Sequence, residues 1–467
     1  MDDTLDTGVS FIHGDPIAPV ILGVTSILLF AVIGRFVARK LGQPTVLGEL
    51  LMGILLGNIA WYLGIDLITV LREGPQVFEV VHQTLAGTPI DQVAVATFGS
   101  ETGAEIVRIV TGPQGGEVMQ VAQTVDVFSR YGVIFLLFMV GLEANLDEMR
   151  QVGADSIRVA ILGVAAPFGL GFAAVTLLLP NIPLNSNLFI AATLGATSIG
   201  ITANVLQEMK RSRSREGHII LGAAVCDDIL GLIILAVVSG IVVSGSIDVA
   251  EIITVIVVSS LFLVGAISLG PAIVRFSASI MGRLDIVEAK MFTSYLFVMV
   301  LAWAANLAGL ATIIGAFAAG IVLSDSFFSD YELAKKRTVT IRELIMPLEV
   351  ILVPIFFILM GIQVKLEAFM SWPVISVAAG LLVAAIIGKL ISGLGARRPV
   401  SKLIVGIGMM PRGEVGLVFA AIGRTLGVID DAIFSAIVLM VMVTTLVAPP
   451  LLKLAIHAQG HRETAVD

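Results

Sequence analysis

Charged residues and cysteine are both scarce in this chain of 467 residues. Only 14% of its residues are charged, whereas a soluble globular domain has roughly 25%. The single cysteine, Cys226, excludes an intrachain disulfide and any metal or cluster site that needs several cysteines. No pairing of a nucleophile with a base and no metal-ligand motif is recognisable, so we expect neither an enzyme nor a bound cofactor. The N-terminal residues lack the basic region of a cleaved signal peptide.

Apolar residues make up most of what remains. Hydrophobic residues account for 57% of the sequence, and the mean hydropathy is +1.01. These values are typical of an integral membrane protein. Many Gly, Ala and Ser residues lie inside the apolar runs, as expected for membrane helices that pack closely. The sequence therefore predicts an all-α integral membrane protein.

The apolar runs are long enough to predict about 13 transmembrane helices. The run from 289 to 325 is too long for one span and is divided at 306–309. The predicted spans lie near residues 16–36, 44–65, 125–146, 157–180, 187–207, 217–243, 249–269, 289–307, 309–325, 346–364, 373–394, 402–424 and 431–456. An odd number of spans places the two termini on opposite sides of the membrane.

Lysine and arginine are distributed unequally between the two sets of predicted loops. Loops on one side, with the tail, hold 21 of the 28 basic residues. Because cytoplasmic loops are enriched in Lys and Arg, this side is expected to be cytoplasmic. We therefore expect a multi-pass protein of the plasma or inner membrane, with its N-terminus outside and its C-terminus in the cytoplasm.

The predicted spans divide the chain into five parts. These are an outer N-terminal segment (1–15), the first two spans (16–65), an extracytoplasmic insert (66–124), the remaining transmembrane core and dimerisation helices (125–456) and a short cytoplasmic tail (457–467). Within the insert we expect short helices at Val77–Leu85 and Gly103–Val110. The insert contains no recognisable motif, and a decorative loop is the simplest interpretation of it.

Two adjacent acids, Asp227 and Asp228, lie in the middle of the apolar run 217–243. One carboxylate at the bilayer centre costs about 2.5–3.5 kcal/mol on insertion scales, and a second adds repulsion between like charges. Such a pair can be buried if it takes up protons, binds a monovalent cation or pairs with a base. All three possibilities favour ion transport over a purely structural polar pair.

A buried base is available in Lys389, which lies inside the predicted span 373–394. An unpaired ammonium there would be about as costly as a carboxylate, and a pair with one of the aspartates would lower that cost. The alternative is that Lys389 extends toward the inner membrane surface.

Two predicted spans contain residues that interrupt helices. The span 187–207 contains Gly195, Thr197, Ser198, Gly200 and Thr202, and the span 402–424 contains Pro411, Arg412, Gly413, Glu414 and Gly416. If spans 1–6 and 8–13 are inverted repeats, both are the fifth span of their half. Broken helices at matching positions are the best sequence indication of a transporter site.

The polar residues at these two breaks have distinct expected roles. Arg412 and Glu414 are expected to neutralise the partial charges of the half-helix ends. Thr197 and Ser198 would supply hydroxyls and freed carbonyls near the carboxylates. Tight packing of small residues is the alternative for each stretch.

These stretches together resemble the monovalent cation:proton antiporter-2 family, with its Nap-type and Kef-type sodium or potassium/proton antiporters. The matching stretches cover nearly all of the membrane part in family order, and as a set they are highly specific. They are residues 43–57, 135–143, 196–202, 224–231, 309–320, 354–357 with Gly361, 388–390 and 411–417.

The resemblance implies a fold of 13 helices in two inverted halves. A dimerisation layer would pack against a mobile six-helix core in which two broken helices cross. Asp228 would alternately bind the cation and the proton, and Asp227 would pair with Lys389. Thr197 and Ser198 match the first crossing segment, and Glu414 matches the second. Two acids with a lysine imply electrogenic exchange.

The predicted function is therefore secondary active antiport, by a homodimer in lipid, of a monovalent cation for protons. Na⁺ is favoured over K⁺. The alternatives are a Kef-type K⁺ efflux system, a cation channel and an ion-sensing membrane protein. A channel would need a ring of acids or carbonyls at a symmetry axis, and a sensor would need a partner domain. The Kef-type C-terminal regulatory domain is absent from this sequence, and no nucleic-acid partner is expected.

Overall fold

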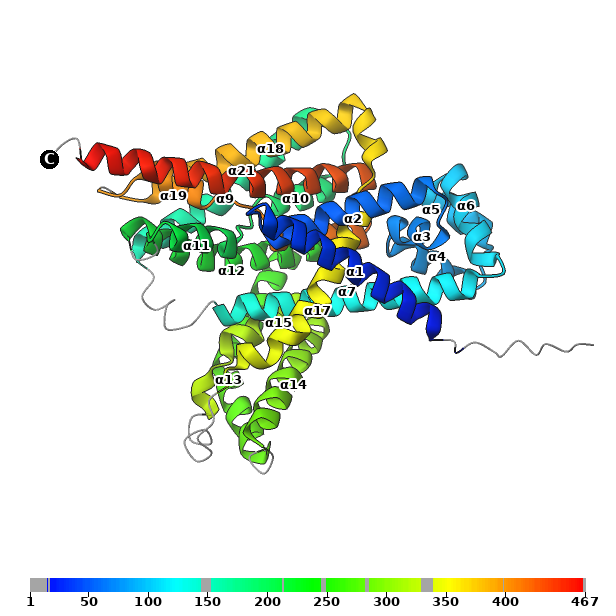
Figure 1. The fold of residues 1–467 in the computed structure, drawn as a ribbon, viewed down its shortest axis with the longest axis horizontal. Coiled ribbons are helices and arrows are strands. Elements are labelled where there is room, and N and C mark those ends of the chain that lie inside the picture. The colour runs from blue at the N-terminus through cyan, green and yellow to red at the C-terminus, as the bar shows by residue number, and fades with distance from the viewer. Residues whose placement is uncertain are drawn as a thin grey trace, which may run out of the picture.

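The computed structural model describes residue 15 and residues 17–143, 153–211, 214–244, 249–281, 285–328, 339–397 and 399–464. Over these residues the chain is helical and forms no strand. Figure 1 shows long helices crossing the molecule and a group of short helices at one end. Apart from Asp15, the predicted N-terminal segment 1–15 lies outside the described residues.

Ten helices of the described part are long and apolar enough to cross a membrane. They are α1 (Ala18–Lys40), α2 (Thr45–Tyr62), α7 (Gly115–Glu143), α9 (Ala154–Leu178), α12 (Arg215–Ser244), α13 (Val249–Met281), α14 (Ile286–Leu307), α17 (Ile341–Ile362), α18 (Trp372–Ser392) and α21 (Asp431–Thr464). Each coincides with one of the predicted spans. The protein is therefore a multi-pass membrane protein.

The other three predicted spans are formed by shorter helices. Span 187–207 is divided into α10 (Leu184–Thr193) and α11 (Ile199–Glu208), and span 402–424 into α19 (Lys402–Gly408) and α20 (Glu414–Thr425). Span 309–325 is the short helix α15 (Thr312–Val322), whose residues 313–322 are all buried. The two helix interruptions occur where the sequence predicted them.

The two halves of the chain repeat the same packing. The contact of α1 with α2 has its counterpart in α14 with α15, and that of α9 with α12 in α18 with α21. In the same way, the packing of α2 on α17 corresponds to that of α15 on α7. The pairs α7–α17 and α9–α18 join equivalent helices of the two halves. This is the arrangement expected of two repeats.

These contacts define two groups of helices. We call α9–α12 and α18–α21 the core bundle, and α1, α2, α7, α14, α15 and α17 the scaffold bundle. The helix α13 packs against α12, α14 and α15, and so links the two groups. Figure 1 shows the core bundle at the upper left and α13 and α14 projecting below.

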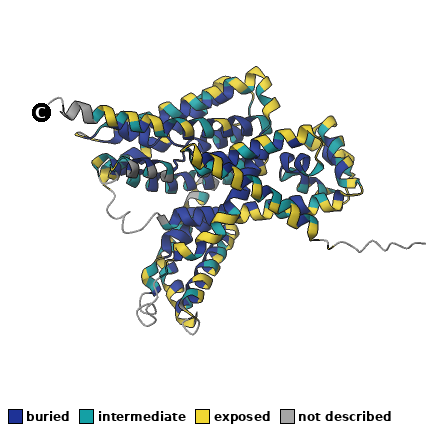
Figure 2. Cartoon of the chain, in the orientation of Figure 1, coloured by how far each residue is buried: buried dark blue, intermediate teal, exposed yellow. Residues whose placement is uncertain are grey.

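The insert folds into four short helices, α3 (Asp66–Glu73), α4 (Gln76–Leu85), α5 (Ile90–Phe98) and α6 (Ser100–Thr111). Helices α4 and α6 lie where short helices were predicted. The helix α7 begins at Gly115, before the predicted start of the third span at residue 125. Six residues of α3 are buried, and Val77 and Ile106 join the main hydrophobic core (Figure 2). The insert is thus packed onto the membrane part.

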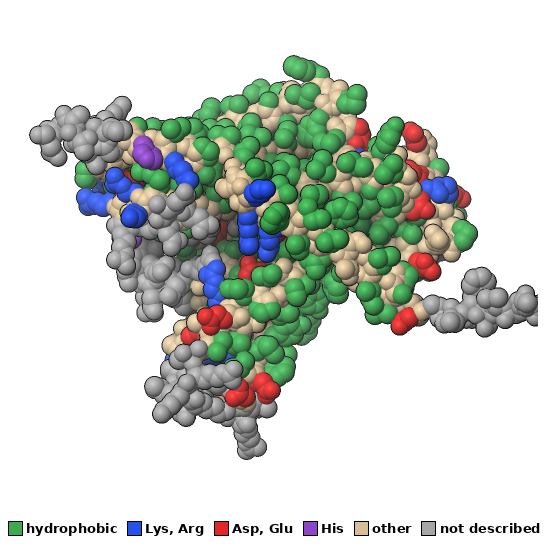
Figure 3. Space-filling model, in the orientation of Figure 1, with side chains coloured by type: hydrophobic (Ala, Val, Ile, Leu, Met, Phe, Trp, Pro, Cys, Tyr) green, Lys and Arg blue, Asp and Glu red, His purple; other side chains and the backbone are tan. Residues whose placement is uncertain are grey.

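Large apolar side chains cover much of the outer surface of the long helices. On α1, Leu22 is 70% and Phe36 66% exposed, and on α13 Leu261 is 65% exposed. On the face in Figure 3, hydrophobic side chains extend broadly over the bundle. In water such patches would promote association, so this surface fits a lipid environment.

Candidate cation site

The two interrupted helices cross at their unwound segments, residues 194–198 and 409–413. The Ser198 backbone N–H donates to the Pro411 carbonyl at 2.9 Å. The Thr197 hydroxyl donates to the Met409 carbonyl at 3.3 Å, and the Thr202 hydroxyl to the Gly408 carbonyl at 2.6 Å. Backbone freed from a helix in a bilayer must be satisfied by protein or water. Each broken helix here supplies partners for the other.

The local sequence explains the second break. Pro411 has no backbone N–H and cannot continue the hydrogen-bond ladder of α19. A Cβ built on Gly413 would lie 2.7 Å from Ser198 Cβ, so only glycine permits this approach of the two segments. The Thr445 hydroxyl of α21 donates to the Arg412 carbonyl and helps to hold the unwound segment.

A buried ion pair joins α12 to α18 beside the crossing. Lys389 Nζ lies 3.0 Å from Asp227 Oδ2 and 3.1 Å from Oδ1, and both side chains are fully buried. The same ammonium donates to the Gly195 carbonyl in the first break at 2.7 Å. Lys389 therefore points into the bundle, and the alternative in which it extends toward the inner membrane surface is wrong.

The helix α9 packs closely against this ion pair. A Cβ on Gly163 would lie 3.5 Å from Asp227 Oδ1 and 3.6 Å from Lys389 Nζ. Pro167 in the interior of α9 cannot donate to the Gly163 carbonyl, which is therefore freed from the helix ladder. A Cβ on Gly388 would meet Pro167 Cα at 2.5 Å, so small residues allow α9 and α18 to approach here.

Arg412 is also fully buried and points toward the first break. Its Nη1 donates to the Ala196 carbonyl at 2.5 Å. Together with Lys389, it places two cationic groups at carbonyls that follow the C-terminal end of α10. This end carries the negative pole of the helix dipole, so the arrangement fits the predicted charge compensation. The side chain of the second predicted compensating residue, Glu414, lies outside the described part of the structure.

Asp228 follows Asp227 on α12 and is only 4% exposed. Neighbouring residues on an α-helix point about 100° apart, so Asp228 faces a different direction from the carboxylate that pairs with Lys389. Five of the predicted site residues make contacts at or beside the crossing: Asp227, Lys389, Thr197, Ser198 and Arg412. The arrangement combines one neutralised carboxylate with a second buried one.

Sequence reasoning assigned no role to several residues that build this site. Thr445 holds the second break, and Gly163 and Pro167 bring α9 against the ion pair. A proline inside an otherwise uninterrupted apolar helix was the available signal for Pro167. Thr444 and Thr445 form a pair of hydroxyl residues in an apolar run, which gave a weaker signal.

Comparison with known proteins adds an independent observation. Residues 26–456 match the family of transmembrane sodium/hydrogen exchangers. The chain is 36% identical over 462 residues to the high-affinity Na⁺/H⁺ antiporter NhaS3 of Synechocystis sp., covering 97% of this chain and 92% of that protein. It is 33% identical over 370 residues to the Na⁺/H⁺–K⁺ antiporter GerN of Bacillus cereus, covering 77% and 90%.

A solved structure has the same fold. The sodium/proton antiporter MjNhaP1 of Methanocaldococcus jannaschii superposes with a TM-score of 0.58 at 16% sequence identity. The superposition covers 94% of this chain and 97% of that protein. At this identity the likeness concerns the fold alone.

Proposed function

The chain belongs to the sodium/hydrogen exchanger family, and on that premise we propose that it is a secondary active antiporter exchanging Na⁺ for protons by alternating access. The observation that carries the proposal is the buried Asp227–Lys389 pair next to Asp228, at the crossing of two broken helices. Nearby unwound segments offer carbonyls that can replace part of the hydration shell of a cation.

The proposed site divides the work between the two aspartates. Asp227 is held by Lys389, and Asp228 binds either a proton or the cation. In this proposal a proton and the cation compete for Asp228, so that binding of one displaces the other. If Lys389 also releases a proton when its contact with Asp227 changes, each transport cycle moves more protons than cations. The exchange is then electrogenic, and the titration belongs to the whole cluster.

The similar proteins support Na⁺ as the substrate. NhaS3 is an Na⁺/H⁺ antiporter, and GerN is an Na⁺/H⁺–K⁺ antiporter. We therefore favour Na⁺ and keep K⁺ as the alternative ion. Within the family, the paired aspartates and Lys389 favour the Nap-type over the Kef-type subgroup. We further propose a homodimer in the plasma or inner membrane, with the insert on the outside and the C-terminus in the cytoplasm.

Reconstitution in liposomes tests this proposal. Na⁺ or K⁺ is added against an imposed pH gradient, and internal pH is read with the membrane potential either free or clamped by valinomycin. We expect Na⁺ to drive proton movement at a rate that depends on membrane potential. Proton movement driven by K⁺ alone would identify K⁺ as the cation. No proton movement with either cation would contradict antiport and favour a channel or an ion sensor.

A further inference from the structure

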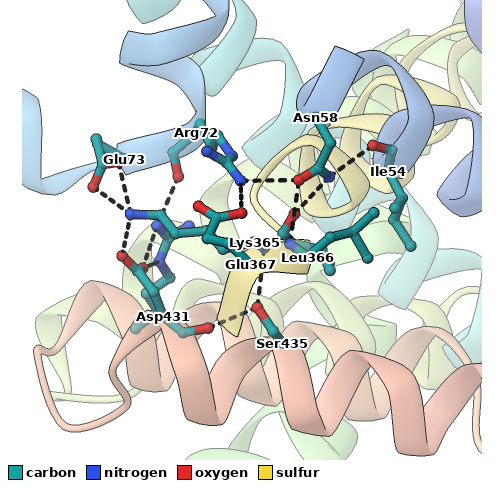
Figure 4. A network of polar contacts seen from close by, with 11 residues as sticks. Ile54, Asn58, Arg72, Glu73, Lys365, Leu366, Glu367, Asp431 and Ser435 are labelled. Atoms are coloured by element: carbon teal, nitrogen blue, oxygen red, sulfur yellow. Dashed lines mark hydrogen bonds and ion pairs between the residues drawn. The ribbon is translucent and has the colours of Figure 1, made fainter. Parts of the chain in front are cut away.

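A cluster of six charged side chains lies at the end of the molecule that carries the insert (Figure 4). Lys365 Nζ is 2.7 Å from Glu73 Oε1 and 2.7 Å from Asp431 Oδ2. Arg424 Nη2 is 2.6 Å from Asp431 Oδ1. The remaining pair joins Arg72 and Glu367. We call these six residues, three cationic and three acidic, the insert-end cluster.

The cluster connects the scaffold bundle to the core bundle. Its two insert residues, Arg72 and Glu73, end α3, which packs against α2, α7 and α17 of the scaffold bundle. Arg424 lies on α20 and Asp431 begins α21, both in the core bundle. The other two lie in the connection from α17 to α18, where the short helix η2 (Leu366–Met370) packs on α18 and α21. Both insert residues are thus fixed to the scaffold bundle and paired with the connection, which is itself hydrogen-bonded to Asn58 of α2 and packs on the core bundle.

Arg72 is held firmly on the scaffold side. Its guanidinium lies over the Trp61 ring at 4.2 Å and donates to Asn58 Oδ1 at 2.9 Å, both on α2. From the core side, Arg424 Nη2 donates to the Arg72 carbonyl at 2.8 Å. Gly74 follows with φ +74°, and a Cβ there would lie 3.0 Å from Arg424 Nη1. The turn after α3 therefore sits directly on a core-bundle arginine.

A cavity of about 560 Å³ lies next to the cluster along the same boundary. Helices α4 and α7 line one side, and the turn 425–427 between α20 and α21 lines the other. The lining residues Pro75 and Thr425 follow closely after Glu73 and Arg424 in the chain. The cavity therefore lies at the same boundary between the bundles, although none of the six cluster residues is among those that line it.

We propose that Arg72 and Glu73 are positioning residues for transport, and that the insert-end cluster is a clamp that holds the core bundle against the scaffold bundle at this end. The clamp opens when the core bundle moves to expose the cation site toward the insert side. This proposal rests on the alternating-access function proposed above. It also gives the insert a role in transport.

The chemistry of the clamp suits surfaces that must separate repeatedly. The six side chains carry three positive and three negative charges, so the closed cluster is neutral. When the bundles separate, each charged group can be hydrated by water. An apolar contact of the same area would have no such partner in the open state, and its separation would cost free energy in proportion to the area exposed.

The test measures opening directly and does not depend on transport. Ser435 is fully buried beneath the cluster and accepts a hydrogen bond from the Lys365 backbone N–H at 3.1 Å. A Ser435→Cys, Cys226→Ser protein carries a single thiol at this place. The rate at which a hydrophilic maleimide labels this thiol in the solubilised protein reports how often the clamp opens.

Two variants are designed to weaken the clamp, and a third serves as a matched control. Glu73→Gln and Glu367→Gln each remove one acid that pairs the insert with the connection between the two bundles. Asp66→Asn removes the acid of the Arg108–Asp66 pair, which lies wholly inside the insert. The Asp66 side chain is 37% exposed and that of Glu367 is 44% exposed, so these two substitutions disturb folding to a similar extent.

We expect labelling to be about tenfold faster in Glu73→Gln and Glu367→Gln, because each loses a hydrogen bond between charged groups. Asp66→Asn should label at the parental rate. In liposomes the two clamp variants should change kcat more than KM, because the cation site is untouched. Parental labelling rates in both clamp variants, or equal acceleration in Asp66→Asn, would overturn the proposal.

Failure of the proposed function would look different. If the parental protein exchanged no cation for protons while labelling still responded to Glu73→Gln and Glu367→Gln, antiport would be rejected. The cluster would then still be a clamp that holds the core bundle against the scaffold bundle. If one clamp variant failed to fold, as judged by its elution and melting, the other would decide the outcome.

Discussion

At the residue scale, the two adjacent aspartates of α12 have different surroundings. Asp227 contacts Lys389 through both of its oxygens, and Lys389 is held in addition by the Gly195 carbonyl. Removing one partner of a buried ion pair leaves an uncompensated charge. Asp228 follows on the same helix, is only 4% exposed, and is the carboxylate that we assign to the exchanged cation and proton.

Substitution of Asp228 by Asn tests this assignment. The amide has nearly the same shape but can neither bind nor release a proton, so we expect exchange to be abolished while the protein stays folded. Liposome transport and melting of the purified protein are the two measurements. Asp91→Asn, an exposed acid of the insert, is the control and should transport normally. Exchange at the parental rate in Asp228→Asn would place the site elsewhere.

Substitution of Lys389 by Ala should affect stability as well as transport. It leaves Asp227 buried without its base, which costs about 3–5 kcal/mol in comparable buried pairs. We therefore expect a lower melting temperature and a changed ratio of charge to cation moved. The double variant with Asp227→Asn should recover part of the stability, because the orphaned charge is gone. Unchanged melting and transport current in Lys389→Ala would remove Lys389 from the mechanism.

At the element scale, the broken helices were the most predictable part of the site. Gly195 marks one break and Pro411 with Gly413 the other, because backbone freedom and the missing N–H act locally. The partners across the crossing were not predictable. The hydroxyl of Thr445 reaches the second break only because α21 packs beside it, and such contacts depend on the three-dimensional arrangement.

Gly413→Ala tests the crossing itself. The added methyl would fall 2.7 Å from Ser198 Cβ and 2.8 Å from its Oγ, so the two unwound segments must move apart. Overpacking of this kind costs about 1–3 kcal/mol, and we expect reduced melting together with loss of transport. Gly416→Ala is the matched control, since a Cβ there has its nearest neighbours at 3.6 Å. Equal effects of the two substitutions would argue against a specific need for close approach at the crossing.

At the scale of the whole molecule, hydropathy located the ten long apolar helices of the described residues, because each run of apolar residues reports its own burial or lipid contact. Hydropathy also indicated the short helix α15. This helix has only 11 residues, and all of them except Thr312 are buried. The packing of the insert was not predictable in this way. Its apolar residues are spread over four short helices, and only the fold shows that Val77 and Ile106 join the main core.

Hydrogen exchange distinguishes an integral insert from a decorative loop. Most residues of α3 are buried, and the helix packs against α2, α7 and α17. Exposure of its amides to water therefore requires the insert to detach from the scaffold bundle. We expect α3 peptides to exchange at least ~100-fold more slowly than an unstructured chain, as for an element with sizeable local stability. The exposed end of α4, near Leu85, should exchange faster and serves as an internal reference. Exchange of α3 within seconds would mean that the insert is only loosely attached, and a loosely attached insert could not hold the core bundle in place.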